Sequence, residues 1–580
     1  MSAGEQTITV GTAGVKPAVA RRWKAGAIQW GTAALVAVLV LAPLLPIVYQ
    51  AFLDKSLYEK DAALTLRKFV DLAADPAFGP ALLNTLLFAL LATVLSQVIG
   101  GVVALLVGRT NLPGRGFVSN LIVWPIFISP LVTTTGWSIV YGPAGYVTML
   151  LKLSTGVEPF WNLYSISGMA VVAAVCQAPI SYLYCLSVTR SSDAALEDSA
   201  RTAGLKPWRV FARITLPLMF PALLISGILN FVILIETLSI PLMFGRPVNI
   251  ELLTTFIYAR GLNAARPDYG LISAAALILI AVIVGLTLMQ RFLLRRPERF
   301  VTIGGKATRP RRFELGRWRW GLLAVMLVYL LLLVLLPLTG IVVYAFSSFL
   351  TPLVPLWETL TLDNFKLVFA TDNYTRAFWN SIVISGIGGL LGTALITMLV
   401  FVVHRSEFRF RRTLDVMAML PRAMPGIIAG IGIFYATIII PPLGWLRETI
   451  ALIMVALIMR YIPLGYGVIT AAMLKVDKQL DRSARVLGAD WWTTMRRIGL
   501  PLLKTAMVSC FVILFIHFFK DYSTAVFLYA PGGEVLGTTM LQMFLSGQTG
   551  PAAALATLQI AMTVLVILLA RRISGVSLHG

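Results

Sequence analysis

Two polar stretches of this chain have closely similar sequences: LEDSARTAGLKPWRVFARITLP at residues 196–217 and LDRSARVLGADWWTTMRRIGLP at residues 480–501. They lie 284 residues apart, and ten of their 22 aligned positions are identical, including a Ser-Ala-Arg triplet, one glycine and the final proline. The rest of the chain is mostly apolar. The repeat therefore indicates one polar loop that is present in two copies.

Composition places most of the chain in a lipid bilayer. Of its 580 residues, 58% are hydrophobic and 13% are charged, and the mean hydropathy is +0.84. Soluble domains carry about 25% charged residues, and a helix needs about 20 apolar residues to cross the hydrocarbon core. Twelve such runs are predicted, at residues 27–52, 81–107, 118–141, 168–189, 218–240, 271–293, 321–346, 378–403, 413–440, 450–471, 503–520 and 553–570. The fold class is thus an all-α membrane protein.

Prolines interrupt two of these runs. Pro125 and Pro130 fall in the third run, and Pro421 and Pro425 fall in the ninth. Proline removes a helical hydrogen bond and its ring clashes with the preceding turn, so these two spans are expected to be the least regular.

Basic residues are concentrated on one side of the predicted membrane. With the N-terminus in the cytoplasm, cytoplasmic segments hold 33 Lys and Arg, the opposite side holds 11, and four lie in or at the ends of spans. This positive-inside bias predicts that both termini are cytoplasmic. It also explains the net charge of +22 without a nucleic-acid partner.

The repeat extends from the polar loops to the whole chain. At an offset of 296 residues, Asn84 aligns with Asn380 and Arg109 with Arg405. Two six-span halves are expected, and they keep the same orientation because six is an even number. The expected segments are a cytoplasmic tail at 1–26, a first half at 27–293, a basic cytoplasmic linker at 294–320, a second half at 321–572 and a cytoplasmic tail at 573–580.

Each polar loop is expected to contain a short helix that stops at a glycine. Asp193 and Asp477 suit N-caps, and Gly204 and Gly488 suit a left-handed stop. The final proline of each stretch is expected at the start of the next span, where N–H groups lack helical partners. An interfacial amphipathic helix without a partner is the simpler interpretation, but it does not require the shared spacing.

The spacing resembles the cytoplasmic loop signature of permease subunits of bacterial ABC importers: Glu-Ala-Ala, three residues, Gly, nine residues, Ile-x-Leu-Pro. The residues of these loops are Glu197, Asp198, Ser199, Ala200, Gly204, Ile214, Leu216 and Pro217 in the first copy, and Asp481, Arg482, Ser483, Ala484, Gly488, Ile498, Leu500 and Pro501 in the second. Both copies depart from the signature at its acidic position. Asp198 is a conservative replacement, whereas Arg482 reverses the charge and leaves Asp481 as the nearest acid.

The resemblance implies that each loop forms a coupling helix that docks on a separate ABC ATPase subunit. Two loops then imply two ATPase copies, with ATP and Mg²⁺ on that partner and no cofactor in this chain. The chain has no G-x-x-x-x-G-K-[ST] motif, so it is not expected to be an enzyme. The resemblance further implies a periplasmic or extracellular solute-binding protein and a place in the bacterial inner membrane.

The fused two-half form resembles ferric-iron-type and thiamine-type permeases, and ferric iron is the expected cargo. Thiamine, polyamines and phosphonates are the alternatives. A proton-coupled secondary transporter can also have two parallel six-span halves, but that interpretation leaves the polar loops without a role. A membrane scaffold or receptor is a third interpretation.

Four charged residues fall within or beside predicted spans: Arg422, Arg460, Glu236 and Asp521. A charge at the centre of a span costs roughly 2.5–3.5 kcal/mol on insertion scales, so each residue requires an explanation. They either line a translocation path between the halves or pair with one another between helices. The arginines would suit an anionic cargo and the carboxylates a cation, and neither His404 nor His517 is expected to be a metal ligand.

Overall fold

The computed structural model describes residues 18–59, 61–191, 199–200, 202–262, 264, 266–293 and 313–574. Within these ranges the chain is helical, and β-pairing is confined to three isolated bridges. The long helices are α1 (Ala18–Ala51), α3 (Phe78–Arg109), α7 (Ile166–Ser191), α10 (Leu216–Ile235), α12 (Tyr269–Leu293), α13 (Trp318–Tyr329) continued by η6 (Leu330–Leu335) and α14 (Leu336–Ala345), α17 (Asp372–Arg405), α20 (Ile450–Met473), α23 (Leu500–Lys520) and α25 (Thr549–Ser574).

Ten helices in the described part of the chain are long and apolar enough to cross a membrane, and two bent pairs bring the total to twelve. The first pair joins Arg115–Phe127 to Pro130–Thr155 at 108°, and the second joins Arg411–Ala423 to Gly426–Ile439 at 114°. These twelve elements correspond to the twelve predicted spans. The bends fall at the predicted prolines, where the chain lacks N–H donors to continue one helix.

The bent pairs are built from shorter helices, and further short helices connect the spans. The first pair contains α4 (Arg115–Val123), η1 (Trp124–Phe127), α5 (Pro130–Tyr141) and α6 (Tyr146–Thr155), and the second contains α18 (Arg411–Met419), η7 (Leu420–Ala423) and α19 (Gly426–Ile439). The connecting helices are α2 (Arg67–Ala74), α9 (Pro207–Val210), η2 (Phe211–Thr215), η3 (Pro241–Gly245), η4 (Arg246–Val248), α11 (Leu253–Gly261), α15 (Leu356–Thr359), α16 (Asp363–Ala370), η8 (Pro441–Glu448), α21 (Gln479–Val486), α22 (Trp491–Thr494), η9 (Met495–Gly499), η10 (Ala525–Phe527) and α24 (Leu536–Leu545).

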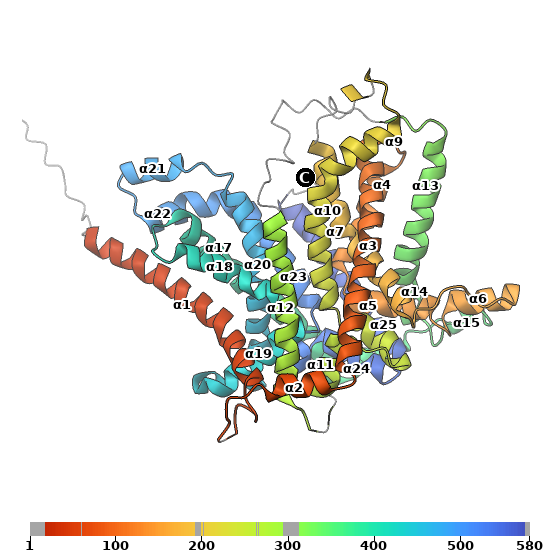
Figure 1. Ribbon diagram of the computed structural model, residues 1–580, viewed down its shortest axis with the longest axis horizontal. Coiled ribbons are helices and arrows are strands. Elements are labelled where there is room, and N and C mark those ends of the chain that lie inside the picture. Colours follow the sequence, from red (N-terminus) through yellow and green to blue (C-terminus); the bar gives the residue numbers. More distant parts are fainter. Residues whose placement is uncertain are drawn as a thin grey trace, which may run out of the picture.

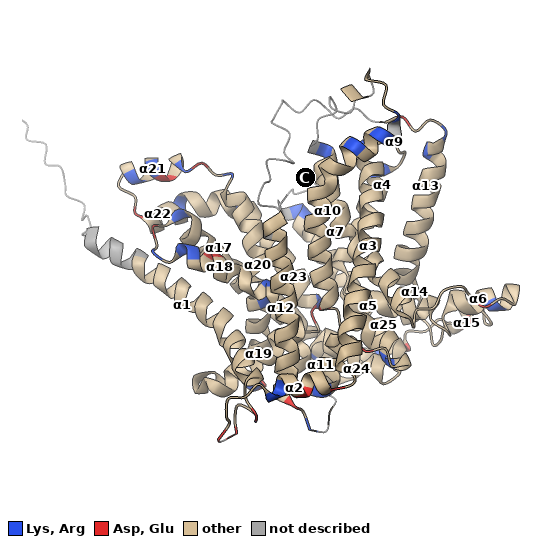
Figure 2. Cartoon of the chain, in the orientation of Figure 1, with Lys and Arg blue, Asp and Glu red and all other residues tan. Residues whose placement is uncertain are grey.

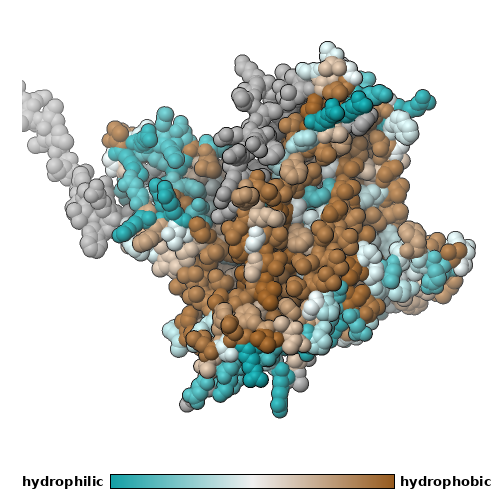
Figure 3. Space-filling model, in the orientation of Figure 1, coloured by the Kyte–Doolittle hydropathy of each residue, from teal (hydrophilic) through white to brown (hydrophobic). Residues whose placement is uncertain are grey.

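The helices form a bundle with polar ends and an apolar middle. Helices α9 and α21 lie at the upper end in Figure 1, and α2, α11 and α24 lie at the lower end. Lys and Arg gather at the upper end around α9 and α22, whereas both signs of charge occur at the lower end beside α2 (Figure 2). Apolar side chains form a broad band between these ends (Figure 3). This band is the surface that a bilayer would cover.

The first span of each half packs against a broken span of the other half. Helix α1 contacts α19, and α14 contacts α5. Both contacts depend on a glycine, because a Cβ on Gly432 would overlap the Pro43 carbonyl and a Cβ on Gly136 would overlap the Pro337 carbonyl. Gly136 and Gly432 lie 296 residues apart, at the offset of the sequence repeat. The two halves therefore hold each other through equivalent close contacts.

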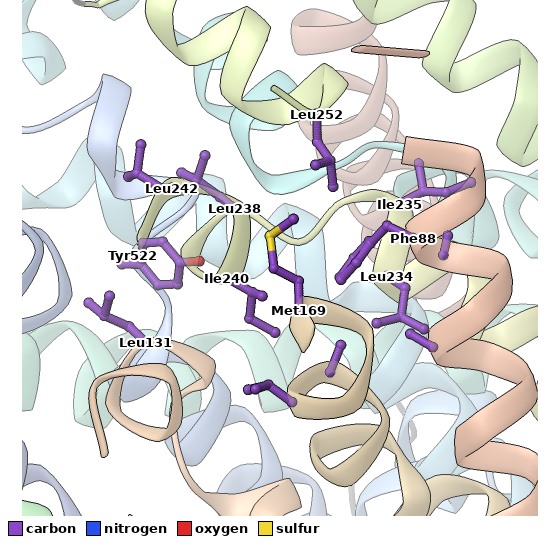
Figure 4. Close-up of a cluster of buried hydrophobic side chains, with 14 of the residues drawn as sticks. Phe88, Leu131, Met169, Leu234, Ile235, Leu238, Ile240, Leu242, Leu252 and Tyr522 are labelled. Atoms are coloured by element: carbon purple, nitrogen blue, oxygen red, sulfur yellow. The ribbon is translucent and has the colours of Figure 1, made fainter. Parts of the chain in front are cut away.

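One large buried cluster extends across both halves. Figure 4 shows part of it, where Tyr522 from the second half lies beside Leu238, Ile240 and Leu242 from the first. The Tyr522 hydroxyl also accepts a hydrogen bond from the backbone N–H of Ser239 at 2.7 Å. This shared packing fixes the segments that follow α10 and α23 against each other.

Candidate functional site

The second polar loop contains the short helix α21. The predicted N-cap was one residue too early: Lys478 occupies that position and its side chain makes no capping bond, although the backbone N–H of Gln479 donates to Asp477 Oδ1 at 2.9 Å. The helix ends at Val486, and Gly488, two residues later, has a left-handed φ of +82°. The N–H of Ala489 then reaches back to the carbonyl of Ala484 at 3.0 Å. This is the backbone pattern of a Schellman stop, which glycine favours because it has no Cβ.

The first polar loop ends in the same way. Gly204 also has a φ of +82°, and the N–H of Leu205 bonds to the carbonyl of Ala200 at 3.1 Å. Ala200 and its counterpart Ala484 are both buried, whereas Ser199 and Ser483 are exposed. The predicted glycine stops are thus confirmed in both loops. Asp193, Glu197 and Asp198 lie outside the described residues.

The helix that follows each loop differs from the prediction. It begins at Pro207 or Trp491, well before the proline that was expected to open the span. A π-turn, η2 in the first half and η9 in the second, precedes each proline. Proline has no N–H to donate to the carbonyl four residues before it, and its ring crowds that carbonyl. The helix continues past the proline because the preceding turn widens into a π-turn. Half-buried Ile214 and Ile498 lie in these turns.

Four further loop residues lie just beyond the π-turns, at the start of α10 and α23: Leu216, Pro217, Leu500 and Pro501. Three of them are exposed and Leu500 is half-buried. The signature Ile-x-Leu-Pro therefore marks the π-turn and the helix after it rather than the first residue of a span.

A nearly buried ion pair ties the second loop to the second span of its half. Arg405 Nη1 lies 2.7 Å from Asp481 Oδ2, and Arg405 Nη2 donates to the carbonyls of Met473, at 3.1 Å, and Val476. The indole N–H of Trp491 donates to the Arg405 carbonyl at 3.0 Å. Asp481 is thus held by its own chain, whereas Arg482 is exposed and has no ion pair among the described residues. These bonds attach the loop to the end of α17.

A cavity of about 610 Å³ lies between the two halves. All four charged residues singled out from the sequence line it, namely Glu236, Arg422, Arg460 and Asp521. Its wall also includes the prolines of both broken spans, Pro125, Pro130 and Pro421. The bends in the third and ninth spans therefore open onto the space between the halves.

Arg460 organises the charges in this cavity. Its Nη1 lies 2.9 Å from Asp521 Oδ2 and donates to the hydroxyls of Ser523 and Thr524 at 2.8 and 2.6 Å. Its Nη2 lies 3.3 Å from Glu236 Oε2, across the boundary between the halves. The side chain of Arg460 is 12% exposed, that of Asp521 2% and that of Glu236 22%. Asp521 is thus deeply held within the second half, and Glu236 forms the looser contact between halves.

The backbone around this cluster is fitted to the guanidinium. A Cβ on Gly426, the first residue of α19, would overlap Arg460 Nη1 and Ser523 Oγ. The Tyr461 hydroxyl adds a hydrogen bond to Asp521 Oδ2 at 3.0 Å. Sequence reasoning missed Gly426 and Tyr461, because neither residue type signals a charge partner that is distant along the chain.

Two further cations lie at the cavity and differ in their contacts. The Lys520 ammonium donates to the Ile126 carbonyl at 2.5 Å, so it too crosses from the second half to the first. Arg422 is exposed, and no ion pair or hydrogen bond engages its guanidinium within the described ranges. Arg422 therefore differs from Arg460 and Lys520, whose side chains are bonded to other parts of the described chain.

Neither histidine highlighted in the sequence sits in a cluster typical of a metal site. His517 lines the cavity and its Nδ1 lies 2.8 Å from the Ile513 carbonyl, while His404 Nε2 lies 3.2 Å from the Tyr466 hydroxyl. Among the described residues there is no group of three or more His, Cys, Asp or Glu side chains placed to hold a metal ion.

The sequence matches the model of one protein family twice, over residues 98–299 and 396–575. That family is described as the binding-protein-dependent transport system inner membrane component. The two matches together cover more than half of the chain, and each falls in one copy of the repeat.

Several known proteins are similar to this chain. It is 27% identical over 467 residues to the ferric transport system permease protein FbpB of Actinobacillus pleuropneumoniae, which covers 79% of this chain and 65% of that protein. It is 24% identical over 537 residues to a protein of Sinorhizobium fredii named "Probable ABC transporter permease protein y4fN", covering 90% and 93% of the two chains. It is 22% identical over 466 residues to the thiamine transport system permease protein ThiP of Salmonella typhimurium, covering 79% and 83%.

Proposed function

Because the chain belongs to the binding-protein-dependent transport system inner membrane components, we propose that it is the membrane-spanning permease of an ATP-driven importer. In this role it moves a small solute, delivered by an external binding protein, into the cytoplasm. The observation that carries the proposal is the pair of polar loops that end in the same left-handed glycine and the same backbone bond, at Gly204 and Gly488. A generic surface helix would not require that geometry twice.

The proposed partners follow from these loops. Two copies of a cytoplasmic ABC ATPase dock on them and hold the ATP and Mg²⁺, while this chain supplies no catalytic group. The coupling residues are those of the two loops, including Asp198, which lies outside the described residues. Both termini and both loops are cytoplasmic in this proposal, and the concentration of Lys and Arg at the α9–α22 end supports that orientation (Figure 2).

The cavity between the halves is the proposed translocation path. Arg460, Glu236 and Asp521 shape its wall, and exposed Arg422 contacts the passing solute. Replacing Arg422 with glutamine should lower uptake without lowering ATPase binding, because its guanidinium holds no other part of the protein together. Unchanged uptake by this variant would remove Arg422 from the path.

Ferric iron is the proposed cargo, supported by the similarity to the ferric transport permease FbpB. The chain spans 65% of the length of that relative, so the assignment rests on the shared part. Thiamine is the second candidate, supported by the similarity to ThiP, and polyamines and phosphonates remain alternatives from the sequence pattern.

The test is reconstitution of the permease in liposomes with its ATPase and its solute-binding protein. ATP-dependent uptake of ⁵⁵Fe(III) loaded on the binding protein is the expected result, with labelled thiamine as the comparison. Uptake driven by a proton gradient in vesicles that lack the ATPase would overturn the importer assignment. Uptake of thiamine in place of iron would overturn only the cargo.

A further inference from the structure

We propose that the second polar loop docks on its ATPase subunit through an exposed apolar pair, Val486 and Leu487, in place of a carboxylate at the acidic position of the family signature. This inference rests on the proposed function, since it assumes that an ATPase binds at these loops. It specifies the chemistry of one of the two docking surfaces.

The apolar pair is almost fully exposed at the polar end of the molecule. Val486 is 86% and Leu487 87% exposed, at the end of α21. In Figure 1, helix α21 lies above α17 and α20, at the hydrophilic upper end of the second half. In Figure 3, apolar atoms stand out among hydrophilic ones in this region. Two adjacent large apolar side chains in water are typical of a surface that a partner covers.

The position of these residues on the helix directs them away from the membrane. Asp481 and Ala484 lie three residues apart on the face that contacts the protein, because Asp481 pairs with Arg405 and Ala484 is buried. Residues three or four apart share a helical face, so Arg482 and Val486 form a second face. Arg482 is exposed, and the loop thus presents an apolar and cationic surface outward.

Each carboxylate of the loop is engaged by its own chain. Asp477 accepts the Gln479 N–H, Asp481 pairs with Arg405, and Asp490 accepts the Thr493 N–H at 3.3 Å. The residue at the acidic position of the family signature is Arg482. The acidic position of the signature therefore offers no carboxylate for docking, and each of the three carboxylates nearby already binds the loop's own chain.

The first loop differs at the same two places. At the repeat offset of 284 residues, the counterparts of Val486 and Leu487 are Thr202 and Ala203, and both are exposed. At these positions the first loop has the smaller Thr202 and Ala203 side chains, where the second has two large aliphatic ones. Because apolar burial scales with the area removed from water, the second loop is the stronger apolar anchor.

The partner surface that fits the second loop is an apolar pocket with an acidic rim. The pocket receives Val486 and Leu487, and the rim faces Arg482. Binding dominated by apolar burial is weakly sensitive to salt, since screening acts on exposed charges rather than on apolar contacts.

The test exchanges the two pairs between the loops. The permease in nanodiscs is titrated with its ATPase, and the dissociation constant is measured for wild type, V486T/L487A and the reciprocal T202V/A203L. V486T/L487A should bind at least about tenfold more weakly, because it loses most of the apolar area of the pair. T202V/A203L should bind as tightly as wild type or more tightly. An unchanged melting temperature for both variants verifies the fold, since all four side chains are exposed.

The outcomes separate this inference from the proposed function. If wild type does not bind the ATPase, the proposed function fails and this inference fails with it. If wild type binds and V486T/L487A binds equally well, the inference alone is overturned. Arg482→Glu should weaken docking by charge repulsion at the rim, and tighter docking by this variant would also overturn the proposal.

Discussion

Replacing Gly426 with alanine should disrupt the charged cluster of the cavity. The new Cβ would occupy the place of Arg460 Nη1, so the guanidinium would have to leave Asp521 or α19 would have to shift. Removing one partner from a buried ion pair costs about 3–5 kcal/mol. Alanine in place of glycine returns up to about 1 kcal/mol through lower chain entropy. The net loss of stability is therefore about 2–5 kcal/mol.

The matched control is Gly467→Ala. Gly467 lines the same cavity from α20, and a Cβ at that position has nothing within 4 Å. Helix propensity alone predicts that both variants are slightly more stable than wild type. For Gly426→Ala, the steric overlap with Arg460 predicts the opposite, a loss of stability.

The measurement is the free energy of unfolding in mixed micelles by SDS titration, together with ATP-dependent uptake in liposomes. Gly426→Ala should unfold at a lower SDS fraction and transport less, while Gly467→Ala should be at least as stable as wild type and transport as well. If Gly426→Ala is as stable as Gly467→Ala, Arg460 does not depend on the space beside α19 and the cluster is less rigid than its geometry indicates.

Three further changes test other parts of the structure. Arg405→Gln should lower the free energy of unfolding by about 1.5–3 kcal/mol, because the loop loses its bond to α17. It should also uncouple ATP hydrolysis from uptake in a coupled ATPase assay. The control, Arg412→Gln, changes an exposed arginine and should leave stability and coupling unchanged. Gly432→Ala should lower the melting temperature through an overpacking cost of about 1–3 kcal/mol against α1, and Gly386→Ala, which meets nothing within 4 Å, should not. Gly488→Ala should cost about 1–2 kcal/mol at its left-handed φ, and coupled ATP hydrolysis should fall while the melting temperature of the spans stays near that of wild type.

The spans were predictable from the sequence because a bilayer imposes both a length and an apolar composition on each helix. The two broken spans were predictable as well, since Pro125, Pro130, Pro421 and Pro425 lie at their bends. The position of the signature prolines within their helices was not predictable. A proline reads as a helix start in sequence, whereas here a π-turn lets the helix pass through Pro217 and Pro501.

The charged cluster was predictable only one residue at a time. Each intramembrane charge stands out in the sequence because placing a charge in a membrane span costs free energy. Glu236 and Arg460, however, are 224 residues apart and meet only through the packing of the two halves. Gly136 and Gly432 gave no signal of their own, because a helical glycine in sequence does not reveal which backbone approaches it.

The continuous helix of the second half has a mechanical consequence. From Trp491 to Lys520 it runs for 30 residues, about 45 Å, with the second polar loop at one end and the Asp521 cluster at the other. If this helix pivots near the loop as a rigid rod, a tilt of about 5° would swing its far end by about 4 Å. Asp521, at that far end, holds Arg460 at 2.9 Å, so the swing would draw Arg460 away from Glu236, which lies 3.3 Å from it in the other half. A small rotation at the membrane surface is therefore enough to part the charges that join the two halves.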